Sequence, residues 1–372
     1  MNKVIHLSIF FFALNLACYA QTPPNGEAEK VTTEEIKVNV SVTDRAGNFV
    51  ADVRAEDLVI DEDGRLHQAS SVRLIAPSVL IALDTGGANR LAKNIQTTRK
   101  IAGNLIGTFA PNAHIAVMQF HDKIEFLSDW QTDRTELLRI VENRTNFGRR
   151  SSFVGAIAAA NDFLAAAPTE NRHLILITDA TDSRNDEAAR AAAIKKLLTG
   201  GAIVHVVSYA PLELAALAPQ TKIIRKGEPN PRRLPPEIEL AILGAGSNSS
   251  LELARLRRFP PRLLSVLTDY PFWKEKNSQT KALIAAQIQL VLLAETTGGE
   301  IVMPESIEEV LENSTTIARS INSQYVVTYA PKRPLKDAPT GEIRQIEASS
   351  RRIGLEAHGA RRLTVFGTEN GK

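Results

Sequence analysis

Cysteine is almost missing from this sequence of 372 residues, because Cys18 is the only one. A chain with a single cysteine forms no internal disulfide, so a hydrophobic core must hold its folded part together. An excess of charge of one sign is missing too. The 44 lysine and arginine residues nearly balance 42 acidic residues, giving a net charge of +2. This balance argues against a dedicated nucleic-acid-binding protein, which would carry a clustered basic excess.

Long hydrophobic runs are also missing beyond the N-terminal segment, so we expect a mature chain that does not span a membrane. Residues 1–20 combine Lys3, an apolar run over 4–14 and small residues up to Ala20, which is typical of a cleaved secretory signal. We therefore expect an exported protein, periplasmic or secreted. Two alternatives remain open here, namely lipid attachment at Cys18 and a retained membrane anchor.

Motifs of the common enzyme chemistries do not occur. The histidines are scattered and form no HExxH or other zinc-binding pattern, and the sequence has neither a Gly-x-Ser-x-Gly elbow nor a phosphate-binding GxxxxGK[ST] loop. His173 and His205 lie beside apolar strands, so we expect them to be packed rather than catalytic. The sequence therefore predicts a protein that is not an enzyme.

Hydrophobic periodicity is what the sequence offers instead. Alternating apolar residues predict a strand at 36–42, within a small β unit. From residue 79 the pattern changes to apolar strands separated by helices, the first helix being about 20 residues long and ending near Phe109. Such alternation predicts an α/β fold, a doubly wound and mostly parallel sheet with helices on both faces.

The expected organisation has five parts. They are a signal peptide at 1–20, a flexible leader at 21–34, an N-terminal β unit at 35–76, an α/β domain at 77–322 with an insertion at 211–280, and a C-terminal β segment at 323–372.

Two of the apolar strands end on a carboxylate. Asp84 closes LIALD, and Asp179 closes LILITD. Ligands of open parallel sheets bind beyond the carboxyl ends of the strands, so these two side chains define a candidate site. The loop RTNFGRRSS at 144–152, which opens a helix, and Asp182 are expected near the same edge.

This arrangement resembles the von Willebrand factor type A domain over roughly 79–210 and 281–322. The resemblance implies a role in protein–protein interaction or adhesion, and a metal-ion-dependent adhesion site where a partner's carboxylate completes the shell of Mg²⁺ or Mn²⁺. The flanks SVTDRAGNFVADVRAEDLVIDEDG and QYVVTYAP resemble the von Willebrand type A-related proteins of acidobacteria. That likeness implies that the two terminal β segments pair into one small domain.

The metal site departs from the family's pattern. Hydroxyl ligands are expected at 86 and 88, where this chain has Gly86 and Ala88. The ligands that remain are Asp84, Asp179 and, in the place of a threonine, Ser151. Since a hard divalent cation wants about six oxygen ligands, we expect no cofactor or, at most, weakly bound Mg²⁺ or Mn²⁺.

The loops around the site supply the residues expected to contact a partner protein of unidentified kind. Gly86 and Gly87 would permit close approach. Arg149 and Arg150 are candidates both for partner binding and for a guanidinium that stands between the two aspartates in place of a cation. Asp182 completes the expected set.

Simpler interpretations stay open at this stage. The polar residues Asp84, Ser151, Asp179, Asp182 and Asn185 could each be a helix N-cap, and the two arginines could be solvated. A metal-dependent hydrolase or transferase using the Asp84 and Asp179 edge is the alternative function. A further alternative is a scaffold whose insertion makes the contacts, with Phe272 and Trp273 either packing or binding a partner.

Overall fold

A computed structural model describes residues 34–87, 93–184, 186–217, 278–304 and 306–365. The insertion therefore lies mostly outside the described residues, and so do Phe272, Trp273, Asn185 and the signal segment. Within the described part, no helix is long and apolar enough to cross a membrane.

A six-stranded sheet forms the centre of the α/β domain, in the order β10-β9-β8-β5-β6-β7. Only β7 runs antiparallel to its neighbour. The strands are β5 (Ser78–Asp84), β6 (His114–Phe120), β7 (Ile124–Phe126), β8 (Arg172–Thr178), β9 (Ile203–Ser208) and β10 (Ile301–Val302). Because β5 and β8 are buried on both faces, their central residues, 79–83 and 174–177, are all aliphatic.

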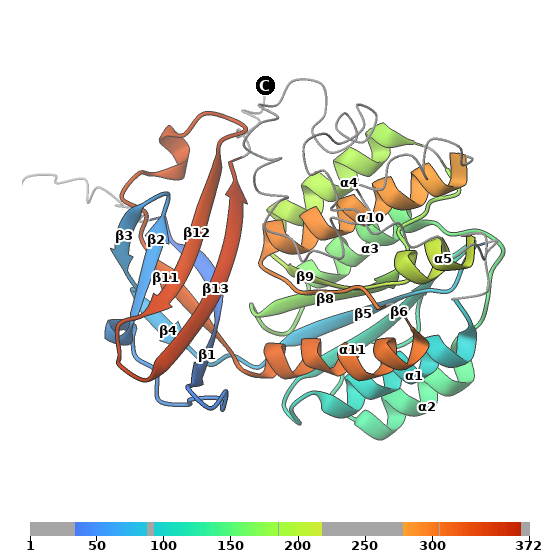
Figure 1. Cartoon of the computed structure of the whole chain (residues 1–372), viewed down its shortest axis with the longest axis horizontal. Coiled ribbons are helices and arrows are strands. Elements are labelled where there is room, and N and C mark those ends of the chain that lie inside the picture. The colour runs from blue at the N-terminus through green and yellow to red at the C-terminus, as the bar shows by residue number, and fades with distance from the viewer. Residues whose placement is uncertain (1–33, 88–92, 185, 218–277, 305, 366–372) are drawn as a thin grey trace, which may run out of the picture. The chain divides into compact units, whose positions relative to one another are not determined.

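Helices cover both faces of this sheet, which confirms the doubly wound fold (Figure 1). One face packs against α1 (Ile95–Thr108), α2 (Arg134–Arg144) and α11 (Ile307–Asn322). The other packs against α3 (Phe153–Ala165), α4 (Glu187–Thr199) and α10 (Ser278–Thr297). A short helix, α5 (Ala210–Leu217), packs on α10 through Leu214. Part of the expected insertion thus belongs to the packed body.

The terminal segments pair into one seven-stranded antiparallel sheet, as the resemblance to the von Willebrand type A-related proteins implies (Figure 1). Its order is β3-β2-β12-β13-β1-β11-β4. The strands are β1 (Ile36–Asp44), β2 (Leu58–Glu62), β3 (Arg65–Gln68), β4 (Ser71–Arg73), β11 (Gln324–Tyr329), β12 (Ile343–Ser350) and β13 (Leu355–Thr364). Single 3₁₀ turns lie at Ala55–Asp57 and Leu335–Asp337.

The first helix of the α/β domain is shorter than expected. It begins at Ile95 rather than directly after the glycines, because Asn94 caps it. The side chain of Asn94 accepts a hydrogen bond of 2.8 Å from the backbone N–H of Thr97. The residue before the cap, Lys93, thus lies outside the helix, and its side chain turns toward the sheet.

Candidate functional site

The carboxyl ends of β5 and β8 bring two aspartates together. The strands are parallel neighbours, with Leu83 opposite Ile177, so Asp84 and Asp179 leave the sheet side by side. Asp84 is fully buried, and Asp179 is 4% exposed. Two buried carboxylates this close require compensating positive charge or protonation.

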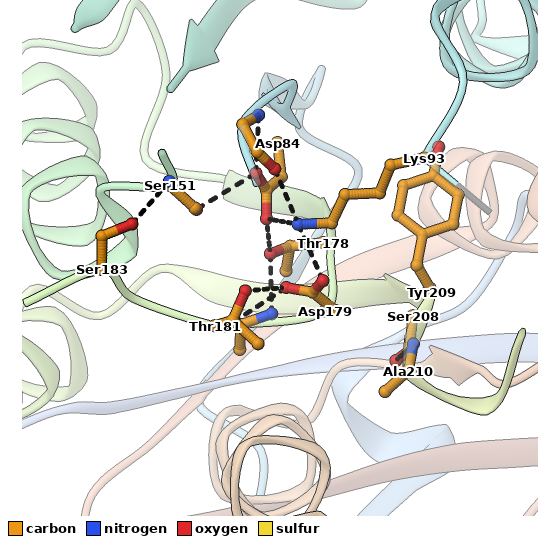
Figure 2. Close-up of polar contacts among 12 residues, drawn as sticks. Asp84, Lys93, Ser151, Thr178, Asp179, Thr181, Ser183, Ser208, Tyr209 and Ala210 are labelled. Atoms are coloured by element: carbon orange, nitrogen blue, oxygen red, sulfur yellow. Dashed lines mark hydrogen bonds and ion pairs between the residues drawn. The ribbon is translucent and has the colours of Figure 1, made fainter. Parts of the chain in front are cut away.

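Lys93 supplies the compensating charge (Figure 2). Its Nζ atom lies 2.8 Å from Oδ2 of Asp84, 2.8 Å from Oδ2 of Asp179 and 3.1 Å from the carbonyl oxygen of Gly86. The lysine itself is 1% exposed. The ammonium group therefore lies between the two carboxylates, shielded from solvent.

Neutral donors complete the surroundings of Asp84. The hydroxyl of Thr178 donates to Oδ2 at 2.6 Å, and the hydroxyl of Ser151 donates to Oδ1 at 3.1 Å. The backbone N–H of Gly86 also donates to Oδ1, at 3.2 Å. Figure 2 shows Thr178 at the end of β8 and Ser151 both directed toward Asp84.

Asp179 is held by its own turn. Its Oδ1 accepts hydrogen bonds from the backbone N–H and the hydroxyl of Thr181, at 2.9 and 2.7 Å. Its Oδ2 is left to face Lys93, so the turn aims one oxygen of the carboxylate at the ammonium group.

The charges of this cluster shift one another's pKa. Burial raises the pKa of Asp84; the nearby Lys93 opposes this shift and the negative Asp179 adds to it. Burial on its own would lower the pKa of Lys93, but attraction to both carboxylates outweighs burial and raises it. Lys93 is therefore an ammonium ion throughout the physiological pH range.

These residues suit an ammonium group better than a divalent cation. The place between the carboxylates that a cation would need is filled by Nζ of Lys93. Gly86 offers a carbonyl oxygen where the family has a hydroxyl, and that oxygen already accepts from Lys93. A divalent cation at this point would also face the lysine's positive charge.

The hypothesis that Arg149 or Arg150 stands between the two aspartates is wrong, because Lys93 occupies that place. Both arginines are exposed. Their loop is tied down through its backbone, where the N–H of Arg149 donates to Asp122 at 2.7 Å. Lys93 reaches the carboxylates from the loop that follows β5 itself.

The structure also distinguishes residues that contact the two aspartates from residues that cap a helix. Ser151 contacts Asp84, and the N-cap residue of α3, Ser152, makes no capping bond with its side chain. Asp182 caps α3 from a neighbouring loop, since its Oδ2 accepts from the N–H of Val154 at 2.7 Å. The N-cap residues of α1, α3 and α4 are Asn94, Ser152 and Asp186, so none of the described candidates is the N-cap of the helix that follows it in the sequence.

A cavity of about 410 Å³ lies above these residues. Its lining includes most of the residues singled out in the sequence, and also two apolar residues of α10. They are Gly87, Arg149, Arg150, Ser151, Asp179, Asp182, Ala282 and Leu283. Asp84 and Gly86 are buried below it and take no part in its surface.

Residues 79–181 match the family model of the von Willebrand factor type A domain. The chain contains a von Willebrand factor type A domain. The matched segment includes Asp84, Ser151 and Asp179, as well as Lys93, which sequence reasoning missed. No curated protein sequence matches the chain.

Solved structures with a similar von Willebrand factor type A fold come from several bacteria. A von Willebrand factor type A protein from Catenulispora acidiphila is 12% identical, covering 92% of this chain and 76% of its own, with a TM-score of 0.40. An aerotolerance-related membrane protein from Bacteroides fragilis is 14% identical, covering 66% and 98%, with a TM-score of 0.37. The domain of a type V pilus tip protein from Porphyromonas gingivalis is 18% identical, covering 28% and 38%, with a TM-score of 0.26. The alignment thus spans well under half of that pilus tip chain.

Proposed function

We propose that this chain is an exported protein-interaction or adhesion module that binds its partner at the carboxyl edge of the parallel sheet, without a divalent cation. The observation that carries the proposal is a cavity lined in part by two exposed arginines, Arg149 and Arg150, above a carboxylate pair that Lys93 already bridges from within.

The arginines give this edge hydrogen-bond donors and positive charge for acidic groups. A guanidinium binds a carboxylate through two parallel hydrogen bonds, which is stronger and more directional than a single contact. The loop that carries them is fixed by the bond from Arg149 to Asp122, and this bond lowers the pKa of Asp122. A partner's Asp or Glu would therefore meet positive charge at a fixed place on the rim, with no need of a bridging metal.

The alternative, a metal-dependent hydrolase or transferase, has less support. Such chemistry needs a metal-bound water beside a substrate. Here Lys93 occupies the space between Asp84 and Asp179, and its high pKa makes it a poor general base. Protein binding requires none of these groups to react.

Binding of an acidic peptide tests the proposed function. The probes are a fluorescent Glu-rich peptide and a Gln-rich peptide of equal length, each titrated into the chain beginning at Gln21 in the presence of EDTA. We expect the acidic peptide to bind and the neutral one not to bind. The double variant Arg149→Ala, Arg150→Ala should weaken binding by about tenfold or more, as expected for loss of charge-assisted bonds.

A matched control separates this effect from net charge. Arg139 and Lys196 are exposed and pair with acids far from the cavity, so Arg139→Ala, Lys196→Ala removes the same charge elsewhere. Equal weakening in the two double variants, or binding that needs Mg²⁺, would contradict the proposal.

Export is tested separately. We expect the chain recovered from outside the cytoplasm to begin at Gln21, as shown by sequencing its N-terminus. A chain that begins at a lipid-modified Cys18 would support the lipoprotein alternative instead.

A further inference from the structure

We propose that Lys93 is a built-in counter-ion that takes the place of the metal, and that its side chain covers a latent divalent-cation site which one substitution opens. This inference deepens the proposed metal independence of the site, and it does not depend on which partner binds. Its argument rests on the bonding of a single ammonium group.

The bonding of that group is complete. An ammonium ion has three N–H donors, and Nζ of Lys93 has three acceptors. They are Oδ2 of Asp84 at 2.8 Å, Oδ2 of Asp179 at 2.8 Å and the carbonyl oxygen of Gly86 at 3.1 Å. No donor is left to contact a partner, so the lysine acts inside the domain and not on its surface.

The carboxylate of Asp84 is equally saturated. Its two oxygens offer about four acceptor sites. Lys93 and Thr178 donate to Oδ2, while Ser151 and the backbone of Gly86 donate to Oδ1. A cation could enter this shell only by displacing one of the donors, and Lys93 is the one that also carries a competing positive charge.

A tethered cation differs from a bound one. Lys93 is joined covalently to the loop after β5, so it cannot be diluted away or removed by a chelator. The fixed charge neutralises one carboxylate of the pair under all ionic conditions. We therefore expect partner binding at the surface above, where Arg149 and Arg150 lie, not to depend on the local concentration of divalent ions.

The same geometry describes the latent site. Three oxygens, from Asp84, Asp179 and Gly86, converge on the position of Nζ. Oxygens are the ligands that Mg²⁺, Mn²⁺ and Ca²⁺ prefer. A metal–oxygen bond is shorter than the hydrogen bonds that Nζ of Lys93 makes, so the three oxygens must move slightly closer together. Truncation of Lys93 to alanine removes the competing charge and leaves space for water molecules to fill the remaining ligand positions.

Thermal unfolding of the chain beginning at Gln21 tests the inference, with Mn²⁺ or Mg²⁺ as the probe. The Tm of the wild type should not change with either ion. The Tm of Lys93→Ala should be lower in EDTA, because two buried carboxylates lose their counter-ion. The Tm of Lys93→Ala should then rise by roughly 5 °C when the concentration of the cation exceeds its Kd about a hundredfold.

The double variant Lys93→Ala, Asp179→Asn is the matched control, since it lacks one of the converging carboxylates. It should show no cation-dependent rise. If Lys93→Ala does not fold in EDTA, refolding in Mn²⁺ compared with EDTA becomes the measurement.

Two results would overturn the inference. One is saturable Mn²⁺ binding by the wild type that Asp84→Ala abolishes, measured by isothermal titration. The other is Lys93→Ala that folds but responds to no divalent cation. Binding of the Glu-rich peptide by the wild type in EDTA is measured independently of both, so failure of the proposed function is distinguishable from failure of this inference.

Discussion

Gly86 shows at the scale of one residue how closely the loops above the sheet pack. A Cβ atom at this position would lie 1.9 Å from the backbone oxygen of Arg150 and 2.9 Å from the Cα atom of His121. Two backbone segments therefore meet where a side chain would be. The absence of a side chain at Gly86 lets the backbones of Arg150 and His121 approach it closely.

This contact predicts that Gly86→Ala is destabilising. We expect the free energy of unfolding, measured in urea, to fall by roughly 2–3 kcal/mol, because backbone must move to make room. Gly107→Ala is the control, since Gly107 lies in α1 with no atom within 4 Å of its Cβ position. There we expect no loss, or a gain of up to about 1 kcal/mol from helix propensity. Equal losses would show that the close approach does not matter.

The site was only partly predictable from single residues. Asp84 and Asp179 meet because the ends of adjacent parallel strands must meet, and Ser151 followed from the family resemblance. Lys93 was missed because strand and helix periodicity says nothing about where the side chains between β5 and α1 point. The signal was present, a lysine directly before the helix cap Asn94 and within the loop of the first carboxylate. Because Arg149 and Arg150 lie in the loop at 144–152, the positive charge between the aspartates was expected from them and not from Lys93.

At the scale of elements, a chain of neutral imidazoles joins β8 and β9. The backbone N–H of Glu300 donates to Nδ1 of His205, so Nε2 of His205 carries the proton and donates to Nδ1 of His173 at 3.1 Å. Nε2 of His173 then donates to Asn171 at 2.8 Å. Both histidines are fully buried, which confirms that they are packed. Each of the two ring N–H groups has one acceptor. A further proton would have to bind a ring nitrogen that already accepts a hydrogen bond, and it would find no acceptor of its own.

The hydrogen-bonded imidazoles of His173 and His205 predict that the free energy of unfolding falls in acid. Burial lowers the pKa of both histidines, that of His205 to about 3, and the charge of His205 lowers that of His173 further. Unfolded histidines take up protons near pH 6.5, so their contribution is complete above that pH and is lost as the pH falls toward 3. As the pH falls from 6 to 5, proton uptake by each of the two histidines in the unfolded state should lower the free energy of unfolding by about 1 kcal/mol.

Urea unfolding at several pH values measures this loss. His205→Gln keeps polar atoms near His173 but does not titrate, so the loss between pH 6 and 5 should shrink by about half. The exposed His358 provides the control, and His358→Gln should leave the slope as in the wild type. A slope unchanged by His205→Gln would contradict the proton assignment.

At the scale of the whole chain, the hydrophobic cores of the two sheets draw on different parts of the sequence. The cores on the two faces of the parallel sheet use residues between Val79 and Ile321 only. The core of the antiparallel sheet uses residues from the two ends, from Ile36 to Ala69 and from Tyr325 to Ala357. The α/β domain is thus inserted between β4 and β11, which pair directly through Val72 and Val327.

This division explains which parts of the fold could be predicted. Strand–helix alternation is a local pattern, so it indicated the parallel sheet without knowledge of distant residues. The antiparallel sheet depends on pairings across nearly the whole chain, such as β1 between β11 and β13. Periodicity identifies these strands but not their partners, and here the resemblance to related proteins supplied the pairing.

The separate cores predict that residues 77–322 fold alone. The fragment keeps every residue of the two cores on the parallel sheet, together with Lys93 and both aspartates. It loses links to the antiparallel sheet, such as the bond of 2.7 Å from Asn39 to Asn171 and the ion pair of 3.3 Å between Arg362 and Glu295. We expect one cooperative urea transition and binding of the Glu-rich peptide within about twofold of the chain beginning at Gln21. A gradual, non-cooperative transition would mean that the parallel sheet needs the antiparallel one, and that the insertion point is no boundary of stability.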